Sequence, residues 1–176
     1  MSKSKKVKKI LGIDPGTSIM GWGIIASNGK EIKPLKYGCI RTEANRPQPE
    51  RLKHIFSSLC DIIKKEKPDT FAIENLFFFK NQKTIISVSQ ARGVAIVCAV
   101  NAGLPVFEYT PLQVKQALTG YGRADKAQMQ EMVRITCKLK ERPKPDDAAD
   151  ALAVAICHAQ SNCDLIDKFQ MPNPKF

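Results

Sequence analysis

No apolar stretch in this sequence is long enough to cross a lipid bilayer. The longest such run covers residues 94–100, whereas a transmembrane helix needs roughly 20 apolar residues. The N-terminus is rich in lysine but lacks the apolar segment of a secretory signal peptide. We therefore expect a cytoplasmic protein with no membrane partner.

Cysteine pairs with metal-binding spacing are also missing. The six cysteines form no C-x-x-C motif, and most of them lie within apolar segments, where a thiol behaves as a small hydrophobic side chain. This pattern indicates neither a zinc site nor a disulfide framework, and it agrees with a reducing compartment. The chain has no internal repeat either.

Acidic residues are scarce relative to basic ones. The chain has 28 lysines and arginines against 17 aspartates and glutamates, which gives a net charge of +11. Residues 1–9 contain five lysines and no acid, so removing them from the count still leaves +6. A positive field of this kind concentrates polyanions and indicates nucleic acid or an anionic membrane surface as partner. Solubility alone is the simpler alternative.

The length of the chain and its composition near the ends predict one domain. A chain of 176 residues can bury one proper core. We expect a basic N-terminal arm over residues 1–9, a single domain over residues 10–160, and a C-terminal tail over residues 161–176.

Apolar runs predict strands in this chain, and apolar residues at spacings of three and four predict helices. The first three strands are joined by short turns and should form an antiparallel meander, whereas the fourth follows a helix and should lie parallel in the sheet. This order predicts an α/β fold. The expected strands are residues 9–14, 21–26, 35–40, 70–74 and 104–109, and the expected helices are residues 49–67, 84–101, 111–118, 126–139 and 145–159.

Four carboxylates stand at positions that suit a metal site. Asp14 and Glu74 each end an apolar strand. Asp147 and Asp150 share one face near the start of an alanine-rich helix, whose small side chains would let it pack closely against the sheet edge. Converging carboxylates normally require a cation, and hard divalent cations such as Mg²⁺ prefer oxygen ligands. The pattern therefore indicates a metal-dependent phosphodiesterase.

Each acid also has a structural explanation. Asp14 begins an Asp-Pro-Gly turn, and Glu74 could face solvent, although an ionised carboxylate inside an apolar stretch is costly. Acids in a first helical turn complement the helix dipole, which explains Asp146 better than Asp150. It stays open whether Asp146 or Asp147 is a ligand, and the Asp-Ala-Ala-Asp spacing favours Asp147.

Together these motifs resemble the RuvC family of Holliday-junction resolvases, which are nucleases of the ribonuclease-H-like fold. The resemblance runs nearly from end to end and implies a resolvase/integrase-type mixed five-stranded sheet flanked by helices. Its landmarks are Ile-Leu-Gly-Ile-Asp-Pro-Gly-Thr at residues 10–17, Gly-Cys-Ile-Arg-Thr at 38–42, Phe-Ala-Ile-Glu at 71–74, Gln-Ala-Arg-Gly-Val-Ala at 90–95, Leu-Pro-Val-Phe-Glu-Tyr at 104–109, Gln-Val-Lys-Gln at 113–116 and Asp-Ala-Ala-Asp-Ala-Leu at 147–152.

The resemblance implies a structure-selective endonuclease that nicks two strands of a Holliday junction symmetrically during recombination and repair. The products would carry 5′-phosphate and 3′-hydroxyl ends. Asp14, Glu74, Asp147 and Asp150 would be the catalytic acids and would hold two Mg²⁺ ions, with Asp14 bridging them and Mn²⁺ as a possible substitute. In such a site one ion activates a water and the other stabilises the leaving 3′-oxygen.

Residues that contact DNA are implied in the same way. Lys115 and Lys126 match family lysines near the scissile phosphate, where a cation offsets negative charge. Phe77 matches an aromatic residue that stacks on a base of the opened junction, and core packing is its alternative role. Further phosphate contacts are expected at Lys80, Lys83, Arg123 and Lys144.

The resemblance also implies protein partners. Two symmetric nicks require two active sites related by a twofold axis, so a homodimer is expected, with the apolar helix of residues 84–101 as its interface. A branch-migration motor complex is a further expected partner. The arm of residues 1–9 is more basic than is usual in the family, and it is either a nonspecific DNA arm or a disordered segment.

Three rival interpretations stay open. An actin-like or sugar-kinase-like ATPase fragment shares the phosphate-loop pattern of residues 12–17, but such proteins need a second, similar subdomain, and this motif occurs once. A ribosomal-RNA-processing nuclease of the related fold could share the first motif, although the match extends well beyond it. A junction-binding protein without activity would have no reason to retain four converging acids.

Overall fold

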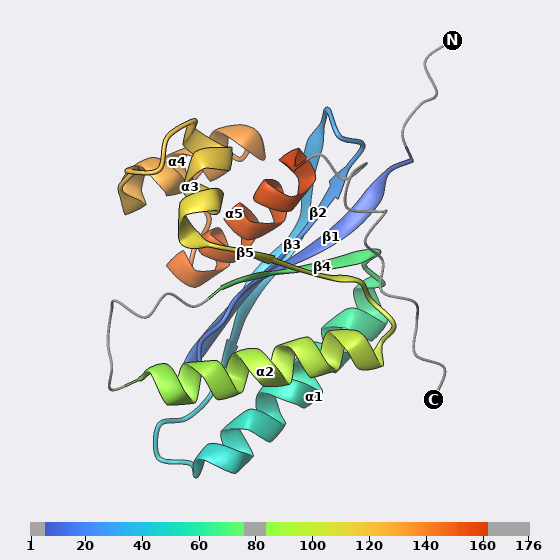
Figure 1. Ribbon diagram of the computed structural model, residues 1–176, viewed down its shortest axis with the longest axis vertical. Coiled ribbons are helices and arrows are strands. Elements are labelled where there is room, and N and C mark those ends of the chain that lie inside the picture. Colours follow the sequence, from blue (N-terminus) through green and yellow to red (C-terminus); the bar gives the residue numbers. More distant parts are fainter. Residues whose placement is uncertain (1–5, 76–83, 162–176) are drawn as a thin grey trace.

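The computed structural model describes residues 6–75 and 84–161, which form a five-stranded mixed sheet between two layers of helices (Figure 1). This arrangement confirms the predicted α/β fold class. The strands are β1 (Lys8–Asp14), β2 (Ile19–Ser27), β3 (Ile32–Arg41), β4 (Thr70–Glu74) and β5 (Val106–Tyr109), and the helices are α1 (Gln48–Glu66), α2 (Ile85–Asn101), α3 (Pro111–Thr119), α4 (Lys126–Thr136) and α5 (Asp146–Gln160).

The strand order β3-β2-β1-β4-β5 follows from two kinds of connection. Short turns join β1, β2 and β3 into the predicted antiparallel meander. Helix α1 then carries the chain to β4, which pairs in parallel with β1, and α2 carries it to β5, which pairs in parallel with β4. Because β2 is antiparallel to both of its neighbours, β1, β3, β4 and β5 all run in one direction. Their carboxyl ends therefore meet at one edge of the sheet.

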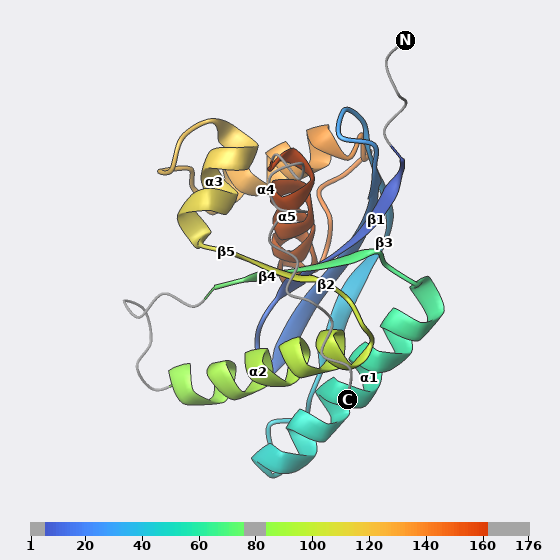
Figure 2. The same cartoon turned by 45° about the vertical axis from the view of Figure 1, so that its right-hand side comes forward.

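Side-chain alternation along the strands divides the core into two clusters. On β1, Leu11 and Ile13 belong to the cluster covered by α1 and α2, whereas Ile10 belongs to the cluster covered by α3, α4 and α5. The two helical layers lie on opposite faces of the sheet (Figure 2). A strand residue's position in this alternation thus decides which helices it meets.

Helix α5 lies directly on the main chain of β1 and β2. A Cβ atom added at Gly12 would lie 2.2 Å from the carbonyl oxygen of Ala151, and one added at Gly21 would lie 1.9 Å from that of Asp147. Neither gap accommodates a side chain. The predicted close approach of this helix therefore depends on strand glycines as well as on the alanines of α5, and the sequence pattern indicated only the alanines.

Helix α4 ends at Thr136, three residues before its predicted end. Lys138 takes a left-handed backbone with a φ of 52°, and the Leu139 N–H donates to the Arg134 carbonyl at 2.9 Å. These are features of a Schellman-type helix end. Leu139 still packs against the core, which explains why the apolar pattern continues past the helix. The other element ends differ from prediction by at most three residues.

The cysteines of the described residues are free thiols, and Cys98, Cys137 and Cys157 are buried in the two clusters. This burial confirms their expected role as small hydrophobic side chains. Of the helices within residues 6–75 and 84–161, none combines the length and the apolar character needed to span a membrane.

Candidate active site

Asp14 and Glu74 lie side by side at the carboxyl edge of the sheet. Strands β1 and β4 pair in parallel with Ile13 opposite Ile73, so the next residue on each strand is one of these two acids. Ile13 and Ile73 both belong to the cluster beneath α1 and α2. By strand alternation, the two acids face the opposite side of the sheet, which α5 covers.

The first turn of α5 brings two more acids to the same place. The Asp147 carbonyl would lie 1.9 Å from a Cβ at Gly21, and Gly21 is the residue of β2 that pairs with Asp14. The start of α5 is therefore stacked over the end of β1. Asp150 follows three residues later, on the same helical face as Asp147. The structure brings all four predicted acids to one edge, as their spacing indicated.

The electrostatics of the site reflect this crowding. Burial raises the pKa of Asp14 well above its ordinary value, and the charges of Glu74 and Asp150 raise it further, with a smaller contribution from Asp147. Burial and then the Asp150 charge raise the pKa of Glu74 to about 7, against the opposing charge of Lys115. The four carboxylates thus lie within electrostatic reach of one another, and their mutual repulsion is only partly balanced.

Asp146 has a different environment from Asp147. A hydrogen bond from Lys126 lowers the pKa of Asp146 below its ordinary value, so this carboxylate is turned toward α4. The charge of Asp147 instead contributes to the raised pKa values of Asp14 and Cys39, which lie on β1 and β3. The geometry therefore associates Asp147 with the strand acids and Asp146 with Lys126.

Lys126 is the first residue of α4 and lies between two acids of α5. Its Nζ is 3.2 Å from Oδ2 of Asp146 and 3.5 Å from Oδ2 of Asp150. Burial raises the pKa of Asp150, and Lys126 opposes that rise. This lysine supplies part of the positive charge that the cluster lacks.

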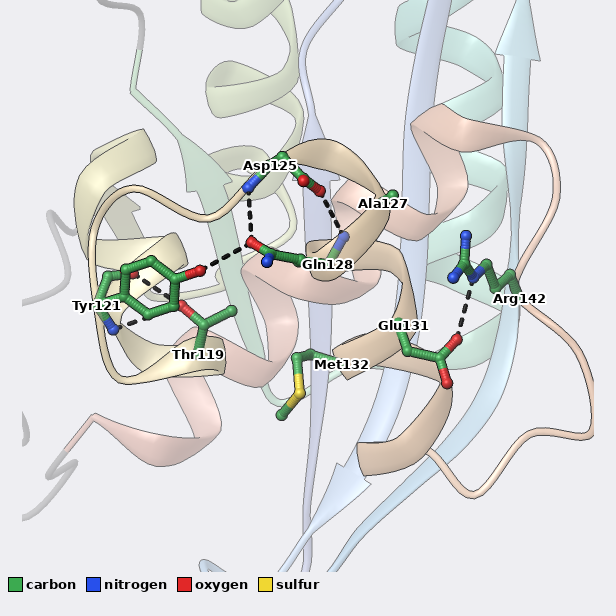
Figure 3. Close-up of a pocket in the computed structure, with 8 residues that line it drawn as sticks. All are labelled: Thr119, Tyr121, Asp125, Ala127, Gln128, Glu131, Met132 and Arg142. Atoms are coloured by element: carbon green, nitrogen blue, oxygen red, sulfur yellow. Dashed lines mark hydrogen bonds and ion pairs between the residues drawn. The ribbon is translucent and has the colours of Figure 1, made fainter.

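A hydrogen-bond network forms at the start of α4, the helix whose first residue is Lys126, and Figure 3 shows its members. The Asp125 Oδ1 accepts from the Gln128 N–H at 2.8 Å, and the Gln128 Oε1 accepts from the Asp125 N–H at 3.1 Å and from the Tyr121 hydroxyl at 2.8 Å. This capping box sets the residue at which α4 begins. The same three residues line an open hollow of about 410 Å³, whose lining includes none of the four acids.

The acids are positioned for cation binding without already enclosing an ion. Within residues 6–75 and 84–161, no three Asp, Glu, His or Cys side chains converge tightly enough to hold a metal as they stand. The donor set consists of carboxylate oxygens, which hard divalent cations prefer. Burial, and then the charges of neighbouring acids, raise the pKa values of Asp14, Glu74 and Asp150, and a divalent cation would offset that negative charge.

The other predicted DNA contacts are placed as follows. Lys115 on α3 is half-buried, and its charge acts on Glu74. Arg123 is exposed in the loop between α3 and α4, and Lys144 is exposed just before α5. Phe77, Lys80 and Lys83 lie outside the described residues.

Arg92 is a residue near the site to which the sequence analysis gave no role. Its Nε donates to the main-chain carbonyl of Glu74 at 3.2 Å, and its Nη2 pairs with the carboxylate of Glu108 on β5. It therefore links α2 to the ends of β4 and β5. An arginine within an otherwise apolar helix was the signal that could have identified it.

Three comparisons describe what this chain is similar to. The family model "Crossover junction endodeoxyribonuclease RuvC" matches residues 10–158. The crossover junction endodeoxyribonuclease RuvC of Desulfitobacterium hafniense is 58% identical over 152 residues, which cover 86% of this chain and 92% of the relative. The solved structure of Thermus thermophilus RuvC has a TM-score of 0.82 and 36% identity, and it covers 90% of this chain and 96% of its own.

The same T. thermophilus protein has been solved with a substrate. The structure of T. thermophilus RuvC in complex with a Holliday junction has a TM-score of 0.82 and 37% identity to this chain, and it covers 86% of this chain and 93% of its own.

Proposed function

Because the chain belongs to the RuvC family of crossover junction endodeoxyribonucleases, we propose that it resolves Holliday junctions by nicking two of their strands symmetrically. It would do so in recombination and repair. The family match over residues 10–158 sets aside the ATPase and the RNA-processing nuclease. The observation that carries the proposal is the convergence of Asp14, Glu74, Asp147 and Asp150 at one sheet edge in a chain of net charge +11.

Nucleases of this family depend on divalent metal, and we assign Mg²⁺ to this protein. Asp14, Glu74, Asp147 and Asp150 would hold it, and we propose two ions per active site. A bound divalent cation supplies charge to stabilise the phosphorane-like transition state and lowers the pKa of a water. The protein's own contribution is to hold four carboxylates against their repulsion on two strands and a helix whose packing leaves them little freedom to separate.

Lysines around the acids would orient the substrate. Lys126 and Lys115 border the carboxylates on α4 and α3, where their charges would offset those of the scissile phosphate. Arg123 and Lys144, both exposed, are proposed contacts to phosphates further along the backbone. We also propose that Phe77 stacks on a base and that Lys80 and Lys83 contact phosphates. These three residues lie outside the described residues.

Two copies of the chain would act together on one junction. Paired nicks require two active sites related by a twofold axis. Helix α2 supports this proposal because Ile86, Val97 and Val100 expose 72%, 52% and 53% of their surfaces on it, and apolar surfaces of this kind favour association. A branch-migration motor is a further proposed partner.

The direct test is cleavage of a labelled four-way junction with Mg²⁺ and no nucleotide. We expect paired nicks at symmetric positions, with 5′-phosphate and 3′-hydroxyl ends that DNA ligase can seal. A linear duplex of the same sequence serves as the control substrate. Equal cutting of duplex and junction, or no cutting at all, would contradict the proposal.

The Mg²⁺ requirement is expected to depend strongly on pH. Burial and the Asp150 charge raise the pKa of Glu74 to about 7, so below that pH a proton occupies this carboxylate and competes with the cation. The carboxylate becomes available as the pH rises through about 7. The Mg²⁺ concentration for half-maximal cleavage should therefore fall by about tenfold from pH 6 to pH 8. A half-saturation that does not change with pH would rule out this competition.

Replacement of Arg92 by Gln is expected to reduce kcat for junction cleavage by about tenfold, equivalent to about 1.4 kcal/mol. The change removes the guanidinium that holds the Glu74 carbonyl and the Glu108 carboxylate, so Glu74 loses a positional restraint. KM should stay close to wild type, because Arg92 would not touch DNA. The conservative Arg92→Lys variant should recover part of the rate.

Ser89→Ala provides the matched control for Arg92, because Ser89 is exposed on the same helix. Single-turnover cleavage and the oligomeric state would be measured for all variants. A rise in KM without a fall in kcat would show that Arg92 acts on substrate binding instead of on Glu74.

A further inference from the structure

The Gly-Cys-Ile-Arg-Thr motif of residues 38–42 has no role in the site described above. It ends strand β3, which runs in the same direction as β1 and β4. Arg41 therefore reaches the same sheet edge as Asp14 and Glu74. The end of β1 and the loop from β3 into α1 both lie at the lower edge of the sheet in Figure 1.

Hydrogen bonds tie this motif to the turn that follows Asp14. The Thr42 hydroxyl donates to the Thr17 carbonyl at 2.7 Å, and the Thr42 N–H donates to the Ser18 carbonyl at 3.0 Å. Arg51 of α1 adds two bonds at 2.8 Å each, from Nε to the Thr42 hydroxyl and from Nη2 to the Ser18 hydroxyl. The guanidinium of Arg51 is thus held in a fixed orientation at the catalytic edge.

These residues surround a hollow of about 160 Å³. That volume equals about five water molecules, which leaves room for one phosphate group. The hollow is lined by Arg41, Thr42, Glu43, Arg46, Glu50, Arg51 and His54.

The charges of the hollow favour an anion. Arg46 lies 3.1 Å from the Glu43 carboxylate and 3.8 Å from that of Glu50, so it engages both acids of the lining. The hydrogen bonds of Arg51 go to the Thr42 and Ser18 hydroxyls and not to a carboxylate. Arg41 is exposed at the end of β3, and its charge reaches the Cys39 thiol. Three arginines line the hollow against two glutamates, so its lining carries a net charge of +1 with His54 neutral.

We propose that this hollow binds a backbone phosphate of the DNA substrate, with Arg41 and Arg51 as its contacts. This assignment rests on the proposed function and extends it, because it adds a DNA contact on the β3 side of the acids. The predicted contacts on α3, α4 and the loop before α5 all lie on the other helical layer. Arginine suits such a site because its planar guanidinium can donate two parallel hydrogen bonds to one phosphate.

The sheet register gives the spacing between this hollow and the acids. Asp14 pairs with Gly21, and Gly21 pairs with Cys39, so Arg41 lies two strands across and two residues further along. With strands about 4.8 Å apart and about 3.4 Å per residue, the main chains of Asp14 and Arg41 are about 12 Å apart. Duplex DNA rises about 3.4 Å per nucleotide of one strand along its helix axis, so this separation corresponds to roughly three to four nucleotides when it is measured along that axis. A phosphate in the hollow can therefore belong to the strand that is cut.

The test compares the junction affinity of the Arg41→Gln variant with that of the wild-type protein, each in the oligomeric state it has in solution. Fluorescence anisotropy with a labelled four-way junction in EDTA would be measured between about 50 and 200 mM salt. We expect Arg41→Gln to weaken binding about three- to tenfold and to reduce the slope of log K against log salt by about one. Cleavage at saturating junction should stay near wild type, because Arg41 does not touch the acids.

Lys33→Gln is the matched control, because Lys33 is an exposed cation at the opposite end of the same strand. It removes the same charge but should leave the affinity and the salt slope unchanged. Thermal melting would establish that both variants keep the wild-type fold. Equal effects of the two variants would mean a general charge effect and would overturn the assignment.

The remaining outcomes separate this proposal from the function itself. An Arg41→Gln variant with wild-type affinity and a wild-type salt dependence of binding would overturn the phosphate site. An acidic protein segment would then be the alternative ligand of the hollow. A wild-type protein that neither binds nor cuts the junction would instead overturn the proposed function.

Discussion

Replacement of Asp147 by Asn is expected to reduce Mg²⁺-dependent junction cleavage at least about 1,000-fold, equivalent to about 4 kcal/mol of transition-state stabilisation. Asp147 stacks over the end of β1, and its charge reaches Asp14. Asparagine keeps the shape and one oxygen of the side chain but removes the negative charge that a divalent cation needs. The defect should appear in single-turnover cleavage at saturating DNA and Mg²⁺.

Asp146→Asn is the matched control, because it makes the same chemical change one residue earlier in the same helix. Asp146 pairs with Lys126 at 3.2 Å and does not contribute to the raised pKa of Asp14. Cleavage by this variant should stay within about threefold of wild type, a difference of about 0.6 kcal/mol.

Junction binding in EDTA separates chemistry from recognition for these variants. Both should bind at least as tightly as wild type, because each loses a negative charge that repels phosphates. If Asp146→Asn abolished cleavage and Asp147→Asn did not, the two aspartates would exchange their assigned roles.

The positions of the acids on their elements could be predicted because they depend on local patterns. Asp14 and Glu74 end short apolar runs, and a strand that follows a helical crossover lies parallel in the sheet. Parallel strands bring their carboxyl ends to one edge, so the two acids had to meet if β1 and β4 were neighbours. The sequence pattern alone did not require that pairing, because strand order is set by packing across the whole sheet.

The sequence favoured Asp147 over Asp146 as a metal ligand through the Asp-Ala-Ala-Asp spacing, but helical geometry did not decide between them. Both precede Asp150 by about one helical turn, at spacings of four and three residues, so both share its face by helical geometry. The structure separates them through Lys126, which begins α4 and pairs with Asp146 and Asp150. That contact joins two helices whose packing angle no local pattern specifies.

Glycine positions are a second case in which the sequence was not sufficient. A glycine in a strand weakens local structure and often marks a close approach, but the sequence does not say what approaches. Gly12 and Gly21 lie beneath the main chain of α5, which is distant in sequence. The alanines of α5 indicated close packing, and the glycines reveal where that packing occurs.

Gly21→Ala is expected to lower the free energy of unfolding by about 1–3 kcal/mol and to reduce cleavage by about 100-fold. The added methyl group would lie 1.9 Å from the Asp147 carbonyl oxygen, and a main-chain atom cannot rotate away. The first turn of α5 must therefore move from the strands. That movement separates Asp147 from Asp14. A shift of about 1 Å in a catalytic group is enough to reduce the cleavage rate by about 100-fold.

A graded glycine series distinguishes this displacement from general destabilisation. At Gly23 the added Cβ would meet the Leu152 side chain at 2.8 Å and the Leu152 main-chain nitrogen at 3.1 Å. This main-chain contact is less severe than the one at Gly21, so Gly23→Ala should lose less activity than Gly21→Ala. At Gly93 on α2 nothing of the same chain lies within 4 Å, and Gly93→Ala should stabilise the helix by about 0.5–1 kcal/mol without moving α5. Because α2 is also the proposed dimer interface, the cleavage rate of this variant is compared with wild type at matched dimer concentration. Because a closer main-chain contact forces a larger movement of α5, the cleavage rate should fall as the distance to the nearest main-chain atom shortens, even between variants with similar melting temperatures. If the cleavage rates of the three variants instead followed their melting temperatures, loss of stability alone would explain the loss of activity. The close packing of α5 on β2 would then not be what holds Asp147 at the site.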